Sequence, residues 1–137
     1  MLPNMDVRCG IDIADVSRFE KIVKDDNTSF IAKCFTESEI EYCEASKNPA
    51  KKAERYAARF AAKEAVGKAL GTGLLSEGVG MHDIEVLKDS KGAPVIKLTG
   101  GALKHADEIG MASVSVSLSH DGGIAAAYCV MLLEKPE

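Results

Sequence analysis

The longest regular pattern of apolar and polar residues runs from Asn48 to Gly71 and has the period of an amphipathic helix. At about 100° per residue, one face collects Ala58, Ala61, Ala62, Ala65, Val66 and Ala69. Asn48 and Pro49 are typical of a helix start, and Gly71 is typical of a helix end. The pattern therefore predicts one long helix with an apolar core face.

Shorter apolar segments predict the other elements. A strand is expected over 7–13, and Asp15 or Ser17 then caps a helix with Arg18, Lys21 and Lys24 on its outer side. A capping box, Thr36-x-x-Glu39, opens a short helix that runs to about 46. Two hairpins are predicted, with strands over 83–88, 94–99, 113–119 and 124–133, and a helix over 101–109 lies between them. This order predicts an α+β domain with a mainly antiparallel sheet.

The strand over 113–119 is one-sided. Serine occupies every second position from Ser113 to Ser119, and the residues between the serines are apolar. Such a strand needs water, a ligand or a second subunit on its polar face.

Composition narrows the function classes. With 137 residues and 46% hydrophobic residues, the chain is expected to form one domain over 1–137. The formal charge of -4 argues against non-specific nucleic-acid binding, and an acidic partner would need a local basic patch. We expect a cytoplasmic protein without membrane contact, because no apolar run approaches the roughly 20 residues of a membrane span. The four cysteines form no C-x-x-C pair and are expected to be reduced and mostly buried.

The long helix also carries charges beside its apolar face. Glu64 and Lys68 lie just off that face, whereas Arg59 and Lys63 are about 140° and 100° around the helix from Glu64. One helix is thus predicted to serve two surfaces. Spacing alone favours a simpler interpretation, in which Glu64 and Lys68 form an ordinary surface pair.

Asp12 stands in a predicted strand between Ile11 and Ile13, where a carboxylate is costly to bury without compensation. Asp12 is either a metal ligand or an acceptor for backbone N–H groups at the next helix start, and both alternatives stay open. Asp12 and Glu64 together are the kind of ligands that Mg²⁺ takes from a protein, with water and phosphate oxygens completing the shell. The phosphates themselves would then contact Arg59, Lys63 and Lys68.

His120 precedes a glycine turn, where it is either a phosphate donor or base or, more commonly, a surface histidine. Gly71-Thr-Gly73 is no P-loop, because it leaves a helix and lacks the Gly-Lys-Ser/Thr order. A helix cap followed by a turn is predicted there.

Four motifs together resemble the holo-acyl-carrier-protein synthases, which are small phosphopantetheinyl transferases. They are Gly10-Ile-Asp12-Ile with Arg18 six residues beyond the aspartate, RFAAKEAVGKALGTG from residue 59, Lys91-Gly-Ala-Pro94, and SLSHDG from residue 117. The resemblance covers residues 5–132 in the family's order. Arg8 is a departure, because the family often has glycine at that position.

The resemblance implies transfer of phosphopantetheine from coenzyme A to a serine of apo-acyl carrier protein, as in fatty acid biosynthesis. It implies an antiparallel sheet packed on the long helix, and a homotrimer with active sites between subunits. Asp12 and Glu64 match the family's Mg²⁺ ligands, and Glu64 and Lys68 are the catalytic candidates. Coenzyme A contacts are implied for Arg59, Lys63, Lys68, Lys91, Gly92, Pro94 and His120. Carrier protein contacts are implied for Arg18, with Lys21 and Lys24 as further candidates.

Two other functions compete with this one. The first is a different Mg²⁺-dependent transferase that uses the same carboxylates on another acceptor. The second is a non-catalytic module that binds carrier protein through the helix of Arg18.

Overall fold

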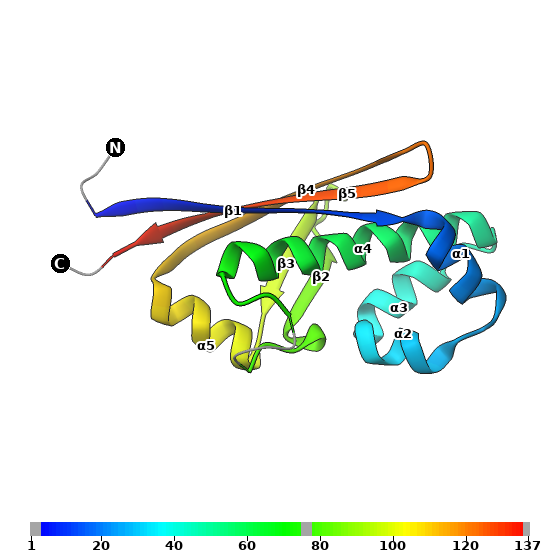
Figure 1. The fold of residues 1–137 in the computed structure, drawn as a ribbon, viewed down its shortest axis with the longest axis horizontal. Helices are drawn as coiled ribbons and strands as arrows, with labels where there is room; N and C mark the ends of the chain where they lie inside the picture. The colour runs from blue at the N-terminus through cyan, green and yellow to red at the C-terminus, as the bar shows by residue number, and fades with distance from the viewer. Residues whose placement is uncertain (1–3, 75–77, 136–137) are drawn as a thin grey trace.

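The long helix forms as predicted and anchors the rest of the chain. The computed structural model describes residues 4–74 and 78–135 (Figure 1). Helix α4 spans Pro49–Leu70. The Asn48 side chain accepts a hydrogen bond from Ala50 N at 2.9 Å, and Gly71 ends the helix with a φ of 86°. Gly71 is thus a left-handed helix cap, which confirms the prediction of a cap at this glycine.

Before α4 come strand β1 (Met5–Asp15) and helices α1 (Val16–Lys24), α2 (Thr28–Cys34) and α3 (Glu37–Glu44). After α4 come a 3₁₀ turn η1 (Met81–Asp83), strands β2 (Ile84–Lys88) and β3 (Pro94–Leu98), helix α5 (Gly100–Ile109), and strands β4 (Met111–Asp121) and β5 (Ile124–Glu134). One sheet has the order β1-β5-β4 and the other pairs β2 with β3, all antiparallel. The predicted α+β fold with mainly antiparallel pairing is confirmed.

Strand β1 lies directly on α4, and Gly10 makes this approach possible. A Cβ atom at Gly10 would lie 2.1 Å from the carbonyl oxygen of Ala65, so only glycine fits. Successive side chains of a strand point to opposite faces, so Asp12 shares the helix-facing side with Gly10. Its neighbours Ile11 and Ile13 point outward and are 58% and 63% exposed. The close contact at Gly10 thereby places Asp12 beside the charged part of α4.

Two apolar cores flank the helix. One lies between the C-terminal half of α4, the larger sheet, the β2–β3 hairpin and α5. The other joins α1, α2 and α3 to the N-terminal half of α4 around Phe19, Phe35 and Tyr56. The helices α1 to α3 are thus fixed at one end of α4, as Figure 1 shows.

Two features were not expected from the sequence. Helix α2 has no predicted counterpart, although Asn27 caps it by accepting a hydrogen bond from Phe30 N at 3.2 Å. Arg8, the departure from the family pattern, donates a hydrogen bond to the carbonyl oxygen of Leu70 at 2.9 Å. Arg8 therefore ties β1 to the end of α4.

The cysteines agree with their prediction. Cys34, Cys43 and Cys129 are buried, Cys9 is exposed, and all four are free. Burial raises the pKa of Cys43 to about 12, so this thiol stays protonated at neutral pH. None of the described helices is long and apolar enough to cross a membrane.

Candidate active site

The charged centre of the molecule forms where β1 crosses α4. Lys68 Nζ lies 3.1 Å from Asp12 Oδ1 and 2.9 Å from the carbonyl oxygen of Ile11. Asp12 therefore does not cap α1. The N-cap of α1 is Asp15, whose side chain makes no capping hydrogen bond. Lys68 pairs with Asp12 and forms no ion pair with Glu64 among the described residues, so the simple surface pair is also wrong.

Glu64 is half-buried beside this pair. Burial raises the pKa of its carboxyl above the ordinary value, and the negative charge of Asp12 raises it further. The cations Lys68 and Arg18 oppose this shift in the pKa. Two carboxylates that repel each other in a partly desolvated place are stabilised by a shared cation. This donor pair fits a hard cation such as Mg²⁺, which usually takes one or two carboxylates together with water and phosphate oxygens. The described residues include no cluster of three or more metal-ligating side chains.

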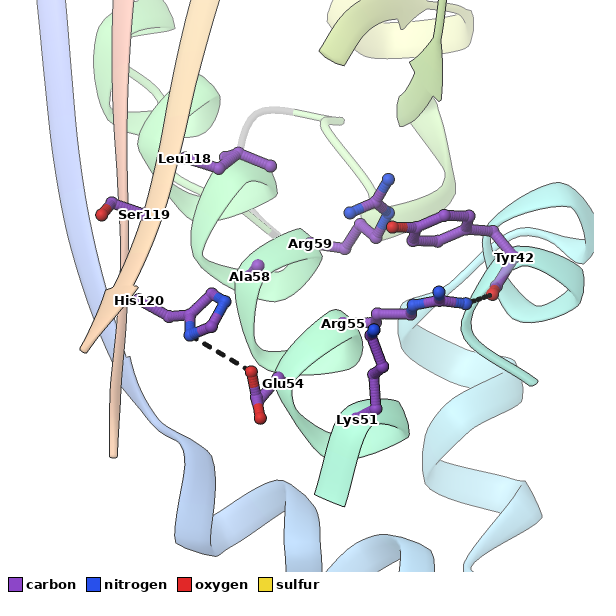
Figure 2. Close-up of a pocket in the computed structure, with 9 residues that line it drawn as sticks. All are labelled: Tyr42, Lys51, Glu54, Arg55, Ala58, Arg59, Leu118, Ser119 and His120. Atoms are coloured by element: carbon purple, nitrogen blue, oxygen red, sulfur yellow. Dashed lines mark hydrogen bonds and ion pairs between the residues drawn. The ribbon is translucent and has the colours of Figure 1, made fainter. Parts of the chain in front are cut away.

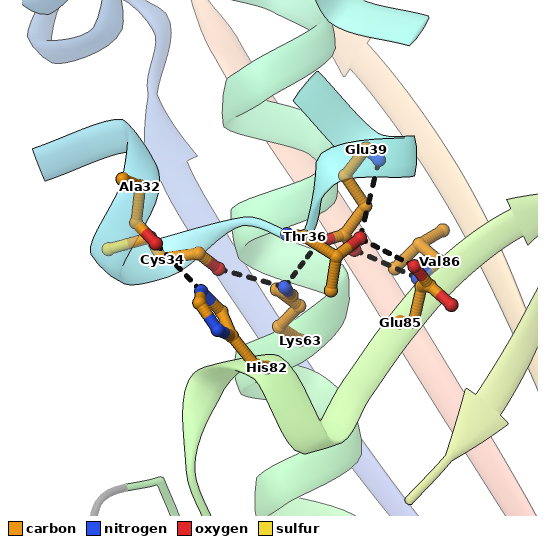
Figure 3. Close-up of polar contacts among 8 residues, drawn as sticks. All are labelled: Ala32, Cys34, Thr36, Glu39, Lys63, His82, Glu85 and Val86. Atoms are coloured by element: carbon orange, nitrogen blue, oxygen red, sulfur yellow. Dashed lines mark hydrogen bonds and ion pairs between the residues drawn. The ribbon is translucent and has the colours of Figure 1, made fainter. Parts of the chain in front are cut away.

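For Lys63, the structure differs from the sequence-based prediction of a phosphate contact. We expected Lys63 to bind phosphate, but its side chain is fully buried and forms an ion pair with Glu39, as Figure 3 shows. Its Nζ also donates to the carbonyl oxygen of Cys34 at 2.8 Å. Glu39 in turn accepts hydrogen bonds from Thr36 N and Val86 N, each at 2.8 Å. Lys63 thus joins α3, α4 and β2 and is occupied by structural contacts, because a phosphate would have to break this buried pair.

A separate cavity of about 220 Å³ lies on another side of α4, between α3 and the end of β4 (Figure 2). Its basic side chains are Lys51, Arg55, Arg59 and His120. Neither Asp12, Glu64 nor Lys68 lines it. Arg59 and Glu64 thus lie on two different surfaces of α4, as predicted for this helix.

Arg59 is the least exposed cation of this cavity. Its side chain is buried, with only 5% of the residue exposed, and its Nε has no hydrogen-bond partner among the described residues. Its guanidinium carbon lies 3.9 Å from the ring centre of Tyr42. A buried N–H donor without a partner is costly unless a ligand satisfies it. Binding of an anion by Arg59 stays a prediction, which this unpartnered donor favours.

His120 of β4 lines the same cavity. Its Nδ1 lies 3.1 Å from Glu54 Oε2. The side chain is 57% exposed, which agrees with a surface histidine, whereas the role as a phosphate donor or base stays a prediction. His120 is a surface histidine, and it also faces a cationic pocket.

Arg18 is exposed on α1, as predicted, and so are Lys21 and Lys24. The guanidinium of Arg18 lies 5.2 Å from the ring centre of Phe60 and 5.4 Å from that of Phe30. It forms no ion pair with any carboxylate in the described part of the chain. Because its charge acts on Glu64, this cation stands near the carboxylate pair.

The turn predicted to contact coenzyme A does not line the cavity. Lys91 and Gly92 are exposed in the β2–β3 turn, which Asp89 closes by accepting hydrogen bonds from Lys91 N and Ala93 N. Pro94 begins β3. None of these three predicted contacts lines the cavity of Arg59.

Sequence reasoning missed several cavity residues, namely Tyr42, Lys51, Glu54 and Arg55. One signal was available: Lys51, Arg55 and Arg59 follow one another at intervals of four residues, which places three cations on one helix face. Tyr42 had no such signal, because it comes from α3 and reaches the cavity only in the folded chain.

Comparisons with known proteins identify the family. The family model described as the 4'-phosphopantetheinyl transferase superfamily matches residues 8–129. The chain belongs to this superfamily. A holo-[acyl-carrier-protein] synthase of Geobacter sulfurreducens is 46% identical over 93% of this chain and 96% of the relative. The predicted family is confirmed.

Solved structures of the family agree. The Helicobacter pylori holo-[acyl-carrier-protein] synthase in complex with coenzyme A has a TM-score of 0.76 and 36% identity, covering 90% of this chain and 98% of that one. The Bacillus anthracis synthase in complex with coenzyme A (3',5'-ADP) has a TM-score of 0.75 and 34% identity, covering 96% and 99%.

Proposed function

We propose that this protein transfers the 4'-phosphopantetheine group from coenzyme A to a serine of apo-acyl carrier protein, as in fatty acid biosynthesis. The products are holo-acyl carrier protein and adenosine 3',5'-bisphosphate. The observation that carries this proposal is the convergence of Asp12, Glu64 and Lys68 at the β1–α4 crossing, in a chain whose relatives are named holo-[acyl-carrier-protein] synthases.

Asp12 and Glu64 are the residues that would hold Mg²⁺. Bound there, the ion supplies charge neutralisation at the diphosphate of coenzyme A. Lys68, which is half-exposed and points to Asp12, is placed to hold a diphosphate oxygen or the attacking serine. Glu64 is the base that accepts the serine proton, either directly or through a water molecule.

The function is tested by the intact mass of a purified apo-acyl carrier protein after incubation with this protein, coenzyme A and Mg²⁺. A gain of one phosphopantetheine group that a chelator abolishes supports the proposal. If several carrier proteins gain no mass while the enzyme is folded, the acceptor is a different one or the protein only binds carriers.

The helix α1 is the proposed docking surface for the carrier protein. Arg18, Lys21 and Lys24 are exposed there and form no ion pairs within the described residues. They supply the local basic patch that an acidic partner needs despite the net charge of -4. Because Arg18 also acts on Glu64, a carrier held by Arg18 lies near the proposed base.

Reversing this charge is predicted to impair carrier binding selectively. We expect Arg18→Glu to raise the KM for carrier protein at least about tenfold, because an attractive contact becomes repulsive, and to leave the KM for coenzyme A unchanged. Steady-state kinetics with each substrate varied in turn measures this. Lys104→Glu, on α5, is the control for the change in net charge. Equal effects on both substrates would rule out a docking role.

We propose a homotrimer, because the outer face of the larger sheet exposes apolar side chains. On this face, Val7, Ile11 and Ile13 of β1 and Tyr128 and Val130 of β5 are 38–63% exposed, beside the serines of β4. Contiguous exposed apolar side chains mark an interaction surface. Further copies of the chain are the proposed cover. Such an assembly also allows one coenzyme A molecule to contact the carboxylate pair of one subunit and the Arg59 cavity of another.

We predict that Ile11→Lys breaks this assembly, because it buries a charge in an apolar contact. Sedimentation is expected to give three times the chain mass of 14.6 kDa for the natural protein and once that mass for the variant. Val95→Lys places the same change on the exposed side of β3 and is expected to leave the trimer intact. A natural protein that sediments as a monomer at concentrations where it is active contradicts the proposal.

The proposed location is the cytoplasm. Four free thiols suit a reducing compartment better than an oxidising one.

A further inference from the structure

The cavity beside α4 is lined by more positive charge than its one carboxylate can balance. Lys51, Arg55 and Arg59 form a cation row in which each residue follows the last by one helical turn. Like charges at this spacing destabilise a helix. None of the three forms an ion pair among the described residues, and the one carboxylate that lines the cavity, Glu54, faces His120 at 3.1 Å. The cation row therefore lacks a counter-ion within this part of the protein.

Tyr42 holds the two arginines of the row in place. Its ring centre is 3.9 Å from the guanidinium carbon of Arg59 and 4.4 Å from that of Arg55. Arg55 also donates a hydrogen bond to the backbone carbonyl oxygen of Tyr42 at 2.8 Å (Figure 2). Aromatic faces attract cations and orient a planar guanidinium. Tyr42 thus offsets part of the repulsion and leaves the remaining N–H donors available to a ligand.

The volume of the cavity limits which part of a ligand can enter it. Its volume of about 220 Å³ is smaller than the roughly 300–1,000 Å³ of sites that enclose a whole small molecule, so one end of a ligand enters. Arginine pairs with phosphate through two parallel hydrogen bonds, and both Arg55 and Arg59 line the cavity. A doubly charged phosphomonoester matches both the size and the charge. Coenzyme A carries one such group, on its 3'-oxygen.

We infer that Arg55 is a second phosphate-binding arginine beside Arg59 and that Tyr42 is the residue that positions both, so that this cavity selects substrates carrying a 3'-phosphate. The inference rests on the proposed function in that coenzyme A is the substrate.

Binding of the nucleotide alone tests Arg55 without any transfer reaction. Calorimetric titration compares adenosine 3',5'-bisphosphate with adenosine 5'-monophosphate. Arg55→Gln is expected to weaken binding of the bisphosphate about tenfold or more and to leave the monophosphate unchanged, because a charged hydrogen bond to the 3'-phosphate is lost. The control is Lys52→Gln on the same helix, since Lys52 pairs with Glu44 outside the cavity. Equal losses for both nucleotides overturn the role of Arg55.

Kinetics with coenzyme A and 3'-dephospho-coenzyme A tests Tyr42. Tyr42→Leu is expected to raise the KM for coenzyme A several-fold, with kcat retained, and to leave the KM for the dephospho substrate unchanged. Tyr42→Phe keeps the ring and should behave like the natural protein. If leucine and phenylalanine act alike, or both substrates respond equally, Tyr42 does not position the arginines. If the protein prefers the bisphosphate in titration but transfers no phosphopantetheine, this inference holds and the proposed function is wrong.

Discussion

Glu64→Gln is expected to lower kcat/KM for carrier modification by at least about 100-fold, since a positioned base alone contributes on the order of 10²–10⁴. The amide removes both the charge that would hold Mg²⁺ and the acceptor for the serine proton. The size of the side chain is kept, and Glu64 makes no hydrogen bond that holds the fold together among the described residues. We therefore expect thermal unfolding and oligomeric state to stay unchanged.

Quantitative mass spectrometry of the carrier protein over time measures this loss. Glu41→Gln is a matched control, because Glu41 is an exposed carboxylate on α3 away from the carboxylate pair. Turnover near that of the natural protein in Glu64→Gln would show that Glu64 only stabilises the fold.

The pKa of Glu64 adds a pH dependence to the same site. Burial and the charge of Asp12 raise this pKa, so in the absence of metal the carboxylate holds its proton to a higher pH than usual. Protons then compete with Mg²⁺ for the carboxylate. Calorimetry with coenzyme A present should therefore show Mg²⁺ affinity falling as the pH decreases toward that raised pKa, and Glu64→Gln should lose this trend.

The largest effect on stability is expected at the buried pair of Lys63 and Glu39. Lys63→Met leaves the Glu39 carboxylate buried with only backbone N–H donors, and removing one partner of a buried pair costs about 3–5 kcal/mol. We expect the midpoint of thermal unfolding, measured at one fixed protein concentration, to fall by roughly 10 °C or more. Adding Glu39→Gln removes the stranded charge and should restore part of the loss.

Lys52→Met, on the same helix as Lys63, serves as the control, because Lys52 forms an ion pair with Glu44 of α3 at 2.9 Å in which both side chains are partly exposed. Exposed pairs contribute about 0–1 kcal/mol, so its midpoint should barely move. If Lys63→Met unfolds like the natural protein and instead loses affinity for coenzyme A, the structural role of Lys63 is wrong.

Lys63 and Arg59 show why two cations of one helix differ in function. Both are buried on α4, but Lys63 has a carboxylate and a carbonyl oxygen as partners, whereas Arg59 has an aromatic ring and an unpartnered Nε. A cation with all its partners inside the protein stabilises the fold. A cation that lines a cavity and keeps an unused donor is a candidate for ligand binding.

Local patterns determined much of this protein in advance. The apolar period from Asn48 to Gly71, the capping box at Thr36 and the alternation of serines in β4 all depend on neighbouring residues, so the elements they predict form as expected. The motifs around Asp12 and Glu64 identified the family for the same reason, because their spacing is written in the sequence. Helix α2 was missed because it has only seven residues and shows no full apolar period.

Only the tertiary structure decided which charges meet. Asp12 pairs with Lys68 because Gly10 lets β1 approach α4, and Lys63 turns inward because Glu39 of α3 is buried against the same helix. Tyr42 reaches the cation row because α3 packs beside α4. Each of these contacts joins residues 13–56 positions apart, so spacing on one helix gives the direction of a side chain but cannot show what lies opposite it.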